Sequence, residues 1–219
     1  MTLPTVIRAS GAAVGEAARA WLLDALRAST RLLVGLAVGE STLPLYGDLP
    51  TDDPAWANRR ILPVDELVPA PADGEQRFAA RLRNALPAAL AERVEDPPDD
   101  PASLAARIDR DGFAAILLGL GPDGHVAFNQ PGSPADSGVR VVTLTPRNLA
   151  RLGDVAPADS ALTIGVGTIV AAERVAVVAA GTGKLAALGR LLDGPPGDDV
   201  PASHLRGHAA LTVIMDACD

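Results

Sequence analysis

The sequence of 219 residues contains one cysteine, Cys218, so it cannot form an internal disulfide and has no cysteine-based metal site. Basic residues are also scarce, because 19 lysines and arginines are set against 27 aspartates and glutamates, which gives a formal net charge of −8. This balance provides no electrostatic footprint for nucleic acid, and we predict no nucleic-acid partner. An anionic ligand would need positive charge concentrated at one place.

Long apolar segments are absent as well. No run approaches the roughly 18 residues needed to span a bilayer, and the first residues, MTLPTVIRAS, lack a basic start followed by an apolar core. We therefore expect a soluble cytoplasmic protein with no membrane partner. The 48% of hydrophobic residues is typical of a globular chain and is enough for a substantial core.

Apolar residues alternate between continuous runs and helical spacing. Continuous runs are expected of strands buried on both faces of a parallel sheet, and they cover residues 31–37, 61–64, 113–118, 174–180 and 210–215. Residues 140–144, RVVTL, resemble another strand. Helical spacing predicts helices over residues 14–26, 78–90 and 185–192. This alternation predicts one doubly wound α/β domain over residues 1–219, with a mainly parallel sheet and helices on both faces.

The segment GLGPDGHVAFNQPGS, residues 119–133, follows the apolar run at 113–118 and concentrates residue types that carry chemistry. Its glycines allow a tight turn and a close approach of backbone N–H groups to a ligand. Asp123 and His125 leave this turn together, and a carboxylate that accepts from one ring nitrogen makes the other nitrogen a stronger base. Alternatively, Asp123 only caps the turn and His125 is an ordinary, partly buried histidine.

Polar segments also follow other predicted strands. Gly39, Ser41 and Thr42 form a short turn whose N–H groups and hydroxyls could receive a phosphate, although the same residues could simply cap a helix. Asp65 and Lys184 each follow a further apolar run. Because the carboxyl ends of parallel strands share one edge of a sheet, we expect these segments to meet there, at a ligand site.

Further positive charge comes from several places in the chain. Lys184 is predicted to begin a helix, which is unfavourable for the helix dipole unless an anion binds there. Arg147 and Arg151 could clamp an anion, although solvent-facing arginines are commoner. The helix predicted over residues 78–90 carries arginines on its flanks, namely Arg77, Arg81 and Arg83.

Segments spread over nearly the whole chain resemble the glucosamine-6-phosphate deaminase/6-phosphogluconolactonase family. In order, they are VGESTLPLY, LPVDELVP, LLGLGPDGHVAFNQPGS, ALTIGVGT and GTGKLAAL. The resemblance implies a Rossmann-like α/β fold that acts on hexose phosphates. The segments HVAFNQPGS, VVTLT and ALTIGVGT are similar to the deaminase branch, whereas the chain length and the segment PASHLRGHAALTVIMD are similar to the lactonase branch.

The resemblance also implies roles for individual residues. The sugar phosphate would be held by Gly39, Ser41, Thr42 and Lys184, with Arg147 or Arg151 as further candidates. In a deaminase, Asp65 would move a proton between the first two sugar carbons, while His125, oriented by Asp123, would open the ring. In a lactonase, His125 would activate water against the lactone carbonyl, and Asp65 would be less central. Neither reaction requires a metal or a cofactor, so we expect a hexose phosphate as the only ligand.

Two residues depart from the family pattern. Gln130 stands where the deaminase motif has a glutamate that completes the acid–base set with Asp65, Asp123 and His125; glutamine keeps the shape but cannot ionise. Glu40 stands where the phosphate loop usually has glycine, and it would repel a phosphate unless it points away or pairs with a cation.

The sequence thus favours a deaminase/isomerase of an amino-sugar phosphate. Hydrolysis of a phosphosugar lactone is the close alternative, and a sugar-phosphate-binding homologue with little or no turnover is a third. The oligomeric state and the exact sugar are left open.

Overall fold

The fold is built on a six-stranded sheet in which all neighbouring strands are parallel, in the order β1-β9-β8-β5-β2-β3. The computed structural model describes residues 3–71, 73–152, 159–181 and 183–216, without the side chains of Arg147 and Arg151. The strands are β1 (Thr5–Ala9), β2 (Leu33–Leu36), β3 (Arg60–Pro63), β5 (Phe113–Gly119), β8 (Val175–Ala179) and β9 (Leu211–Asp216). The predicted parallel sheet is therefore confirmed, and β1 is an additional edge strand that the sequence analysis does not predict.

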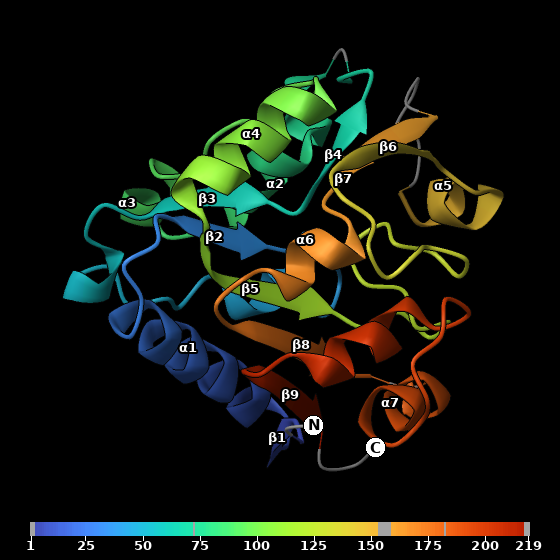
Figure 1. The fold of residues 1–219 in the computed structure, drawn as a ribbon. Helices are drawn as coiled ribbons and strands as arrows, with labels where there is room; N and C mark the ends of the chain where they lie inside the picture. Colours follow the sequence, from blue (N-terminus) through green and yellow to red (C-terminus); the bar gives the residue numbers. More distant parts are fainter. Residues whose placement is uncertain (1–2, 72, 153–158, 182, 217–219) are drawn as a thin grey trace.

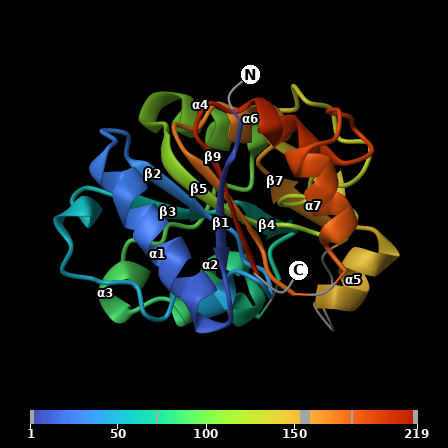
Figure 2. The same cartoon turned by 90° about the horizontal axis from the view of Figure 1, so that it is seen from below.

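The central strands are apolar throughout because both of their faces are covered. On β8, Val175 and Val177 pack into one core cluster, while Ala176 and Val178 pack into another on the opposite face. Figure 2 shows α1 and α3 on one side of the sheet and α4 and α6 on the other. The structure thus confirms the expected doubly wound arrangement with helices on both faces.

The described helices include those that were predicted and others that were not. The α-helices are α1 (Ala12–Arg27), α2 (Phe78–Ala85), α3 (Ala88–Ala91), α4 (Pro101–Asp111), α5 (Pro146–Leu152), α6 (Val166–Val170) and α7 (Leu185–Leu192). Short 3₁₀ helices are η1 (Leu43–Leu45), η2 (Pro54–Trp56), η3 (Gly74–Gln76) and η4 (Pro201–Gly207). The helix predicted over residues 78–90 is two helices, because Leu86 is extended and is followed by Pro87, which lacks an N–H group. Within the described residues, no helix is both long and apolar enough to cross a membrane.

A second, three-stranded antiparallel sheet lies beside the main one, at the side toward which the arrowheads of β2 and β5 point (Figure 1). Its strands are β4 (Asp65–Val68), β6 (Arg140–Thr143) and β7 (Ser160–Thr163), in the order β4-β7-β6. Asp65 was expected only as a residue after a parallel strand. It follows β3, as expected, but it is also the first residue of a strand in this second sheet, which sequence periodicity did not reveal because the strand is only four residues long.

The adjacent carboxylates of β4 point in opposite directions, as alternation along a strand requires. Asp65 reaches a cavity, whereas Glu66 is buried against the N-terminus of α2. Glu66 Oε1 accepts hydrogen bonds from the backbone N–H groups of Leu67 (2.9 Å) and Phe78 (2.8 Å), and Oε2 accepts from that of Ala79 (3.0 Å). Because no side chain of α2 itself caps this end, Glu66 supplies the cap and ties α2 to β4.

We predict that Glu66→Ala lowers the free energy of unfolding by about 2–4 kcal/mol, because it leaves buried N–H groups of α2 without an acceptor. Urea denaturation of the variant and the wild type measures this difference. Glu75→Ala is the control, since among the described residues that exposed carboxylate accepts a hydrogen bond from the Asn84 side chain alone. Equal stability of Glu66→Ala and Glu75→Ala would show that Glu66 does not hold α2 in place.

Candidate functional site

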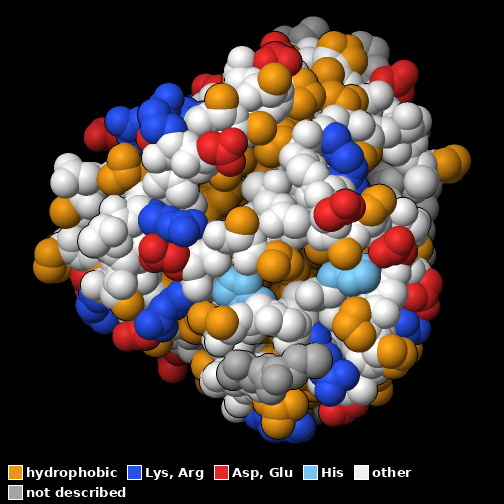
Figure 3. All heavy atoms as spheres, in the orientation of Figure 1, with side chains coloured by type: hydrophobic (Ala, Val, Ile, Leu, Met, Phe, Trp, Pro, Cys, Tyr) orange, Lys and Arg blue, Asp and Glu red, His pale blue; other side chains and the backbone are white. Residues whose placement is uncertain are grey.

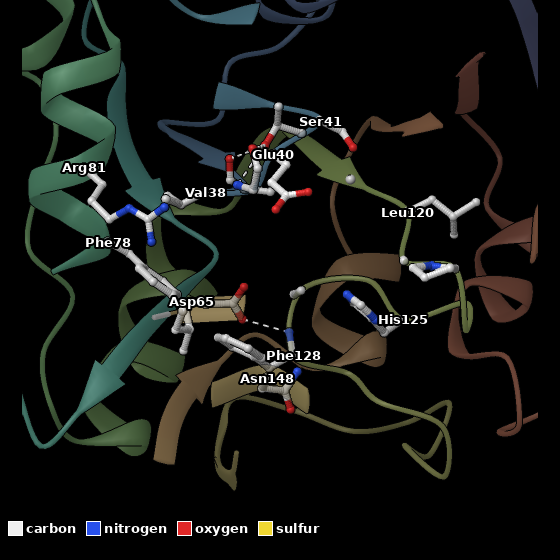
Figure 4. A pocket seen from close by; sticks show the side chains of 18 of the residues that line it. Val38, Glu40, Ser41, Asp65, Phe78, Arg81, Leu120, His125, Phe128 and Asn148 are labelled. Atoms are coloured by element: carbon white, nitrogen blue, oxygen red, sulfur yellow. Dashed lines mark hydrogen bonds between the residues drawn. The ribbon is translucent and has the colours of Figure 1, made fainter. Parts of the chain in front are cut away.

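A cavity of about 210 Å³ opens where the main sheet meets the second sheet. Its walls come from the segment after β2, the start of β4, helix α2, the segment after β5, helix α5 and the start of α7 (Figure 4). The predicted site residues that line it are Gly39, Ser41, Thr42, Asp65, His125 and Lys184. Segments far apart in the sequence therefore converge at the strand ends, as the parallel sheet led us to expect.

His125 is paired with Asp123, two residues earlier in the same turn. The distance from His125 Nδ1 to Asp123 Oδ1 is 2.5 Å, and a proton held between them leaves Nε2 as the basic nitrogen. Burial raises the pKa of Asp123, but the charge of His125 and the hydrogen bonds from its ring and backbone hold that pKa below its usual value. Asp123 thus orients the imidazole and does not itself line the cavity.

The turn before this pair depends on glycine. A Cβ atom at Gly121 would lie 2.2 Å from His125 Cε1 and Nδ1, so any larger residue would displace the imidazole. Gly124 has φ +82, a conformation that side chains with a Cβ rarely adopt. Gly121 and Gly124 therefore allow the tight turn that was predicted, and Gly121 leaves room for the His125 ring.

Asp65 is a buried carboxyl group that lines the same cavity as His125, and it is 8% exposed. Burial raises its pKa from 3.8 to about 7, and the charge of Glu66 acts in the same direction. Hydrogen bonds from Thr163 and from the backbone N–H of Phe128, at 3.0 Å, lower the pKa, as does the charge of Arg140. Asp65 is therefore a carboxyl group that can take up and release a proton near neutral pH.

The strand register explains these neighbours of Asp65. Asp65 lies opposite Thr163 of β7, and Thr163 in turn lies opposite Arg140 of β6, so the three side chains share one face of the second sheet. The backbone N–H of Phe128 also approaches Thr163 Oγ1, at 3.3 Å. Thr163 and Arg140 were not among the predicted site residues, because their relation to Asp65 depends on a pairing that sequence alone does not specify.

The segment from Gly39 to Thr42 forms the other side of the cavity. Thr42 Oγ1 accepts a hydrogen bond from the N–H of Gly39 (3.1 Å) and donates to the carbonyl of Ala37 (2.8 Å), so this buried hydroxyl shapes the loop. Ser41 Oγ lies 2.5 Å from Lys184 Nζ. Lys184 is the N-cap residue of α7, as predicted, and its side chain brings a positive charge to the loop.

Glu40 is exposed and lines the same cavity. Its carboxylate makes no ion pair or hydrogen bond with any residue whose side chain is described, so the expected alternative of a pair with Lys184 is not seen. Figure 4 shows Glu40 projecting toward the centre of the cavity. A ligand anion must therefore bind with this negative charge close by.

The remaining predicted residues are Gln130, Arg147 and Arg151. Gln130 does not line it, and its Nε2 atom is buried without a hydrogen-bond partner among the described residues. Arg147 and Arg151 lie on α5, but their side chains are outside the described part of the structure. The described residues also contain no group of three or more His, Cys, Asp or Glu side chains that could hold a metal ion.

The cavity is also lined by aromatic, basic and amide side chains for which the sequence indicated no role. Phe78 of α2 stacks on Phe128, with ring centroids 6.0 Å apart and an interplanar angle of 18°. Arg81 lies over the Phe78 ring, and Asn148 of α5 lines the cavity below it (Figure 4). Helical spacing indicated that Phe78 is buried, but it could not show that the same helix borders the site.

Figure 3 shows lysine and arginine side chains scattered among aspartate and glutamate on the face in view, without a continuous basic area. The fold and the cavity together define a class: an α/β protein in which a buried carboxyl and a carboxylate-paired histidine adjoin a loop suited to an anion.

Comparison with known proteins gives the family. The chain belongs to the glucosamine-6-phosphate isomerases/6-phosphogluconolactonase family, whose sequence profile matches residues 8–214. It is 34% identical to a glucosamine-6-phosphate deaminase of Beutenbergia cavernae over 84% of this chain and 78% of that one. It is 31% identical to a glucosamine-6-phosphate deaminase of Streptococcus thermophilus over 92% of each chain.

Solved structures agree on the fold. A monomeric glucosamine-6-phosphate deaminase matches with a TM-score of 0.78 at 23% identity, covering 97% of each chain. The 6-phosphogluconolactonase from Trypanosoma cruzi matches equally well, with a TM-score of 0.78 at 22% identity over 99% of this chain and 96% of that one. The fold is therefore common to both branches of the family and does not distinguish between them.

The raised pKa of Asp65 predicts a pH-dependent effect on stability. A group whose folded pKa exceeds its unfolded value stabilises the protein below the unfolded pKa, here 3.8, and this contribution is lost as the pH rises through about 7. Asn keeps an acceptor for the N–H of Phe128 but carries no charge. Asp65→Asn should therefore be more stable than the wild type at pH 8, by an amount on the order of 4 kcal/mol for a shift of about three pKa units.

Urea denaturation at pH 4 and pH 8 measures this effect, and the gain should shrink toward the acidic end. Asp52→Asn is the matched control because Asp52 is exposed, and it should unfold like the wild type at both values. A stability difference for Asp65→Asn that does not change with pH would contradict the raised pKa.

Proposed function

We propose that this protein is a glucosamine-6-phosphate deaminase that isomerises the amino-sugar phosphate to a ketose phosphate and releases ammonia. The observation that carries the proposal is a carboxyl group with a pKa of about 7, Asp65, in one cavity with an imidazole oriented by a second carboxylate. Deaminases of Beutenbergia cavernae and Streptococcus thermophilus among its relatives support the choice of substrate.

The chemistry divides between the two groups. His125 moves a proton from the hydroxyl on the first sugar carbon to the ring oxygen, which opens the ring. Asp65, as a carboxylate, removes a proton from the second carbon and returns it to the first, while the aldehyde oxygen takes up a proton and the amino nitrogen gives one up, which converts the open-chain aldose into a ketose imine. Water then adds to the imine and ammonia leaves, so the sum is amino-sugar phosphate plus water giving ketose phosphate plus ammonia.

The phosphate would be held at the loop. The proposed ligands are the N–H groups of Glu40 and Ser41, the Ser41 hydroxyl and the Lys184 ammonium, in the loop that the bonds between Gly39 and Thr42 shape. Arg147 and Arg151 of α5 are further candidates. Neither a metal nor an organic cofactor enters these steps. The proposed partner is thus a small hexose phosphate.

Lactone hydrolysis is the second candidate, and Gln130 favours it. Water activation by His125 needs only the Asp123 carboxylate, whereas the glutamate of the deaminase motif is replaced here by a side chain that cannot ionise. Under this candidate the ring-opening proton transfer does not occur, and Asp65 has no direct role in bond breaking.

One pair of assays on the purified protein, without added metal, distinguishes the candidates. We expect ammonia release from glucosamine 6-phosphate, and no acid release from freshly made 6-phosphogluconolactone above its spontaneous hydrolysis. Lactone hydrolysis without ammonia would contradict the proposal and assign His125 to water activation. Binding of a hexose phosphate with neither reaction would mean a homologue without turnover.

A further inference from the structure

Helix α2 and its N-cap carry arginines with different surroundings. Arg77 lies 3.8 Å from a carboxylate oxygen of Asp96, and Arg83 lies 2.8 Å from the other oxygen of the same carboxylate. Arg81, between them in the sequence, makes no ion pair or hydrogen bond with a described residue, and its contact is the face of Phe78, at 5.5 Å from the ring centroid. Arg81 is thus a partly buried guanidinium whose N–H groups have no acceptor among the described residues.

Arg81 lines the cavity that also contains Ser41, Asp65 and Lys184. In Figure 4 it reaches from α2 to a position beside Val38, which immediately precedes the loop that begins at Gly39. Val38 and Phe128 both pack against the core cluster that includes Phe78, so the base of Arg81 and the start of the loop share one apolar wall.

The position of Arg81 is fixed by two independent contacts of α2. Glu66 caps the helix from β4, next to Asp65, and the Phe78 ring is stacked on Phe128 from the segment after β5. A guanidinium held over an aromatic ring keeps its edge available for a planar, bidentate contact with an anion. The protein has a net charge of −8, and Glu40 lies in the same cavity, so binding an anion there requires local cations.

The geometry points to Arg81 as a further phosphate-binding residue, which donates hydrogen bonds to the substrate's phosphate from the Val38 end of the loop while Lys184 acts from the α7 end. This assignment rests on the proposed function, because it takes the ligand to be a sugar phosphate. It adds to the loop and Lys184 a cation from α2, an element that sequence resemblance did not connect with the phosphate.

Isothermal titration calorimetry with inorganic phosphate and with glucose 6-phosphate tests the assignment without relying on turnover. Arg81→Ala should weaken the binding of both probes by about 10- to 100-fold, as expected for the loss of charge-assisted hydrogen bonds. Arg81→Lys should recover part of this loss, since it keeps the charge but not the bidentate edge. Arg83→Ala, which removes a guanidinium from the same helix outside the cavity wall, should bind like the wild type.

The possible calorimetry results distinguish the assignment of Arg81 from the proposed function. Wild-type affinity of Arg81→Ala for both probes would overturn the assignment while leaving the proposed function intact. Weaker binding of glucose 6-phosphate with unchanged binding of inorganic phosphate would place Arg81 on the sugar and would also overturn it. If the wild type bound neither probe, the proposed function and this assignment would fail together. A circular dichroism melt of each variant distinguishes lost contacts from lost structure.

Discussion

The burial of the Asp65 carboxyl group is the constraint on which the site depends. A buried carboxylate is costly unless neighbouring dipoles and charges offset its lost hydration. Here the N–H of Phe128 and the Thr163 hydroxyl compensate in part, and the pKa remains near 7. The second sheet is what makes this arrangement possible, because it places Thr163 of β7 directly opposite Asp65 of β4.

The same strand connects the acid–base group to the rest of the cavity. Since neighbouring residues of a strand point in opposite directions, Asp65 faces the ligand and Glu66 faces the N-terminus of α2. Glu66 therefore fixes the helix that carries Phe78 and Arg81. These two adjacent residues thus link the acid–base group of the site to helix α2, which forms one wall of the cavity.

The sequence predicted those features whose signals are local or periodic. The apolar run that became β5 predicted a strand buried on both faces, and the turn after it predicted the Asp123–His125 pair, because both signals are local. Residues 140–144 were predicted as a strand and form β6, but the second sheet itself was not predicted, since its register depends on tertiary contacts. For the same reason, neither the proximity of Arg81 to the cavity nor the position of Gln130 outside its lining followed from the sequence.

The most direct test of the account is the transfer of a proton by Asp65. Fructose 6-phosphate incubated with the wild type and an ammonium salt in deuterium oxide should form the ketose imine and gain deuterium at the first carbon, because a carboxyl that shuttles the substrate proton exchanges it with solvent. Proton NMR measures this gain. Asp65→Asn should abolish this incorporation while still binding glucose 6-phosphate. Incorporation at the wild-type rate in Asp65→Asn would contradict the central role of this carboxyl, and its absence from the wild type would contradict an isomerase mechanism altogether.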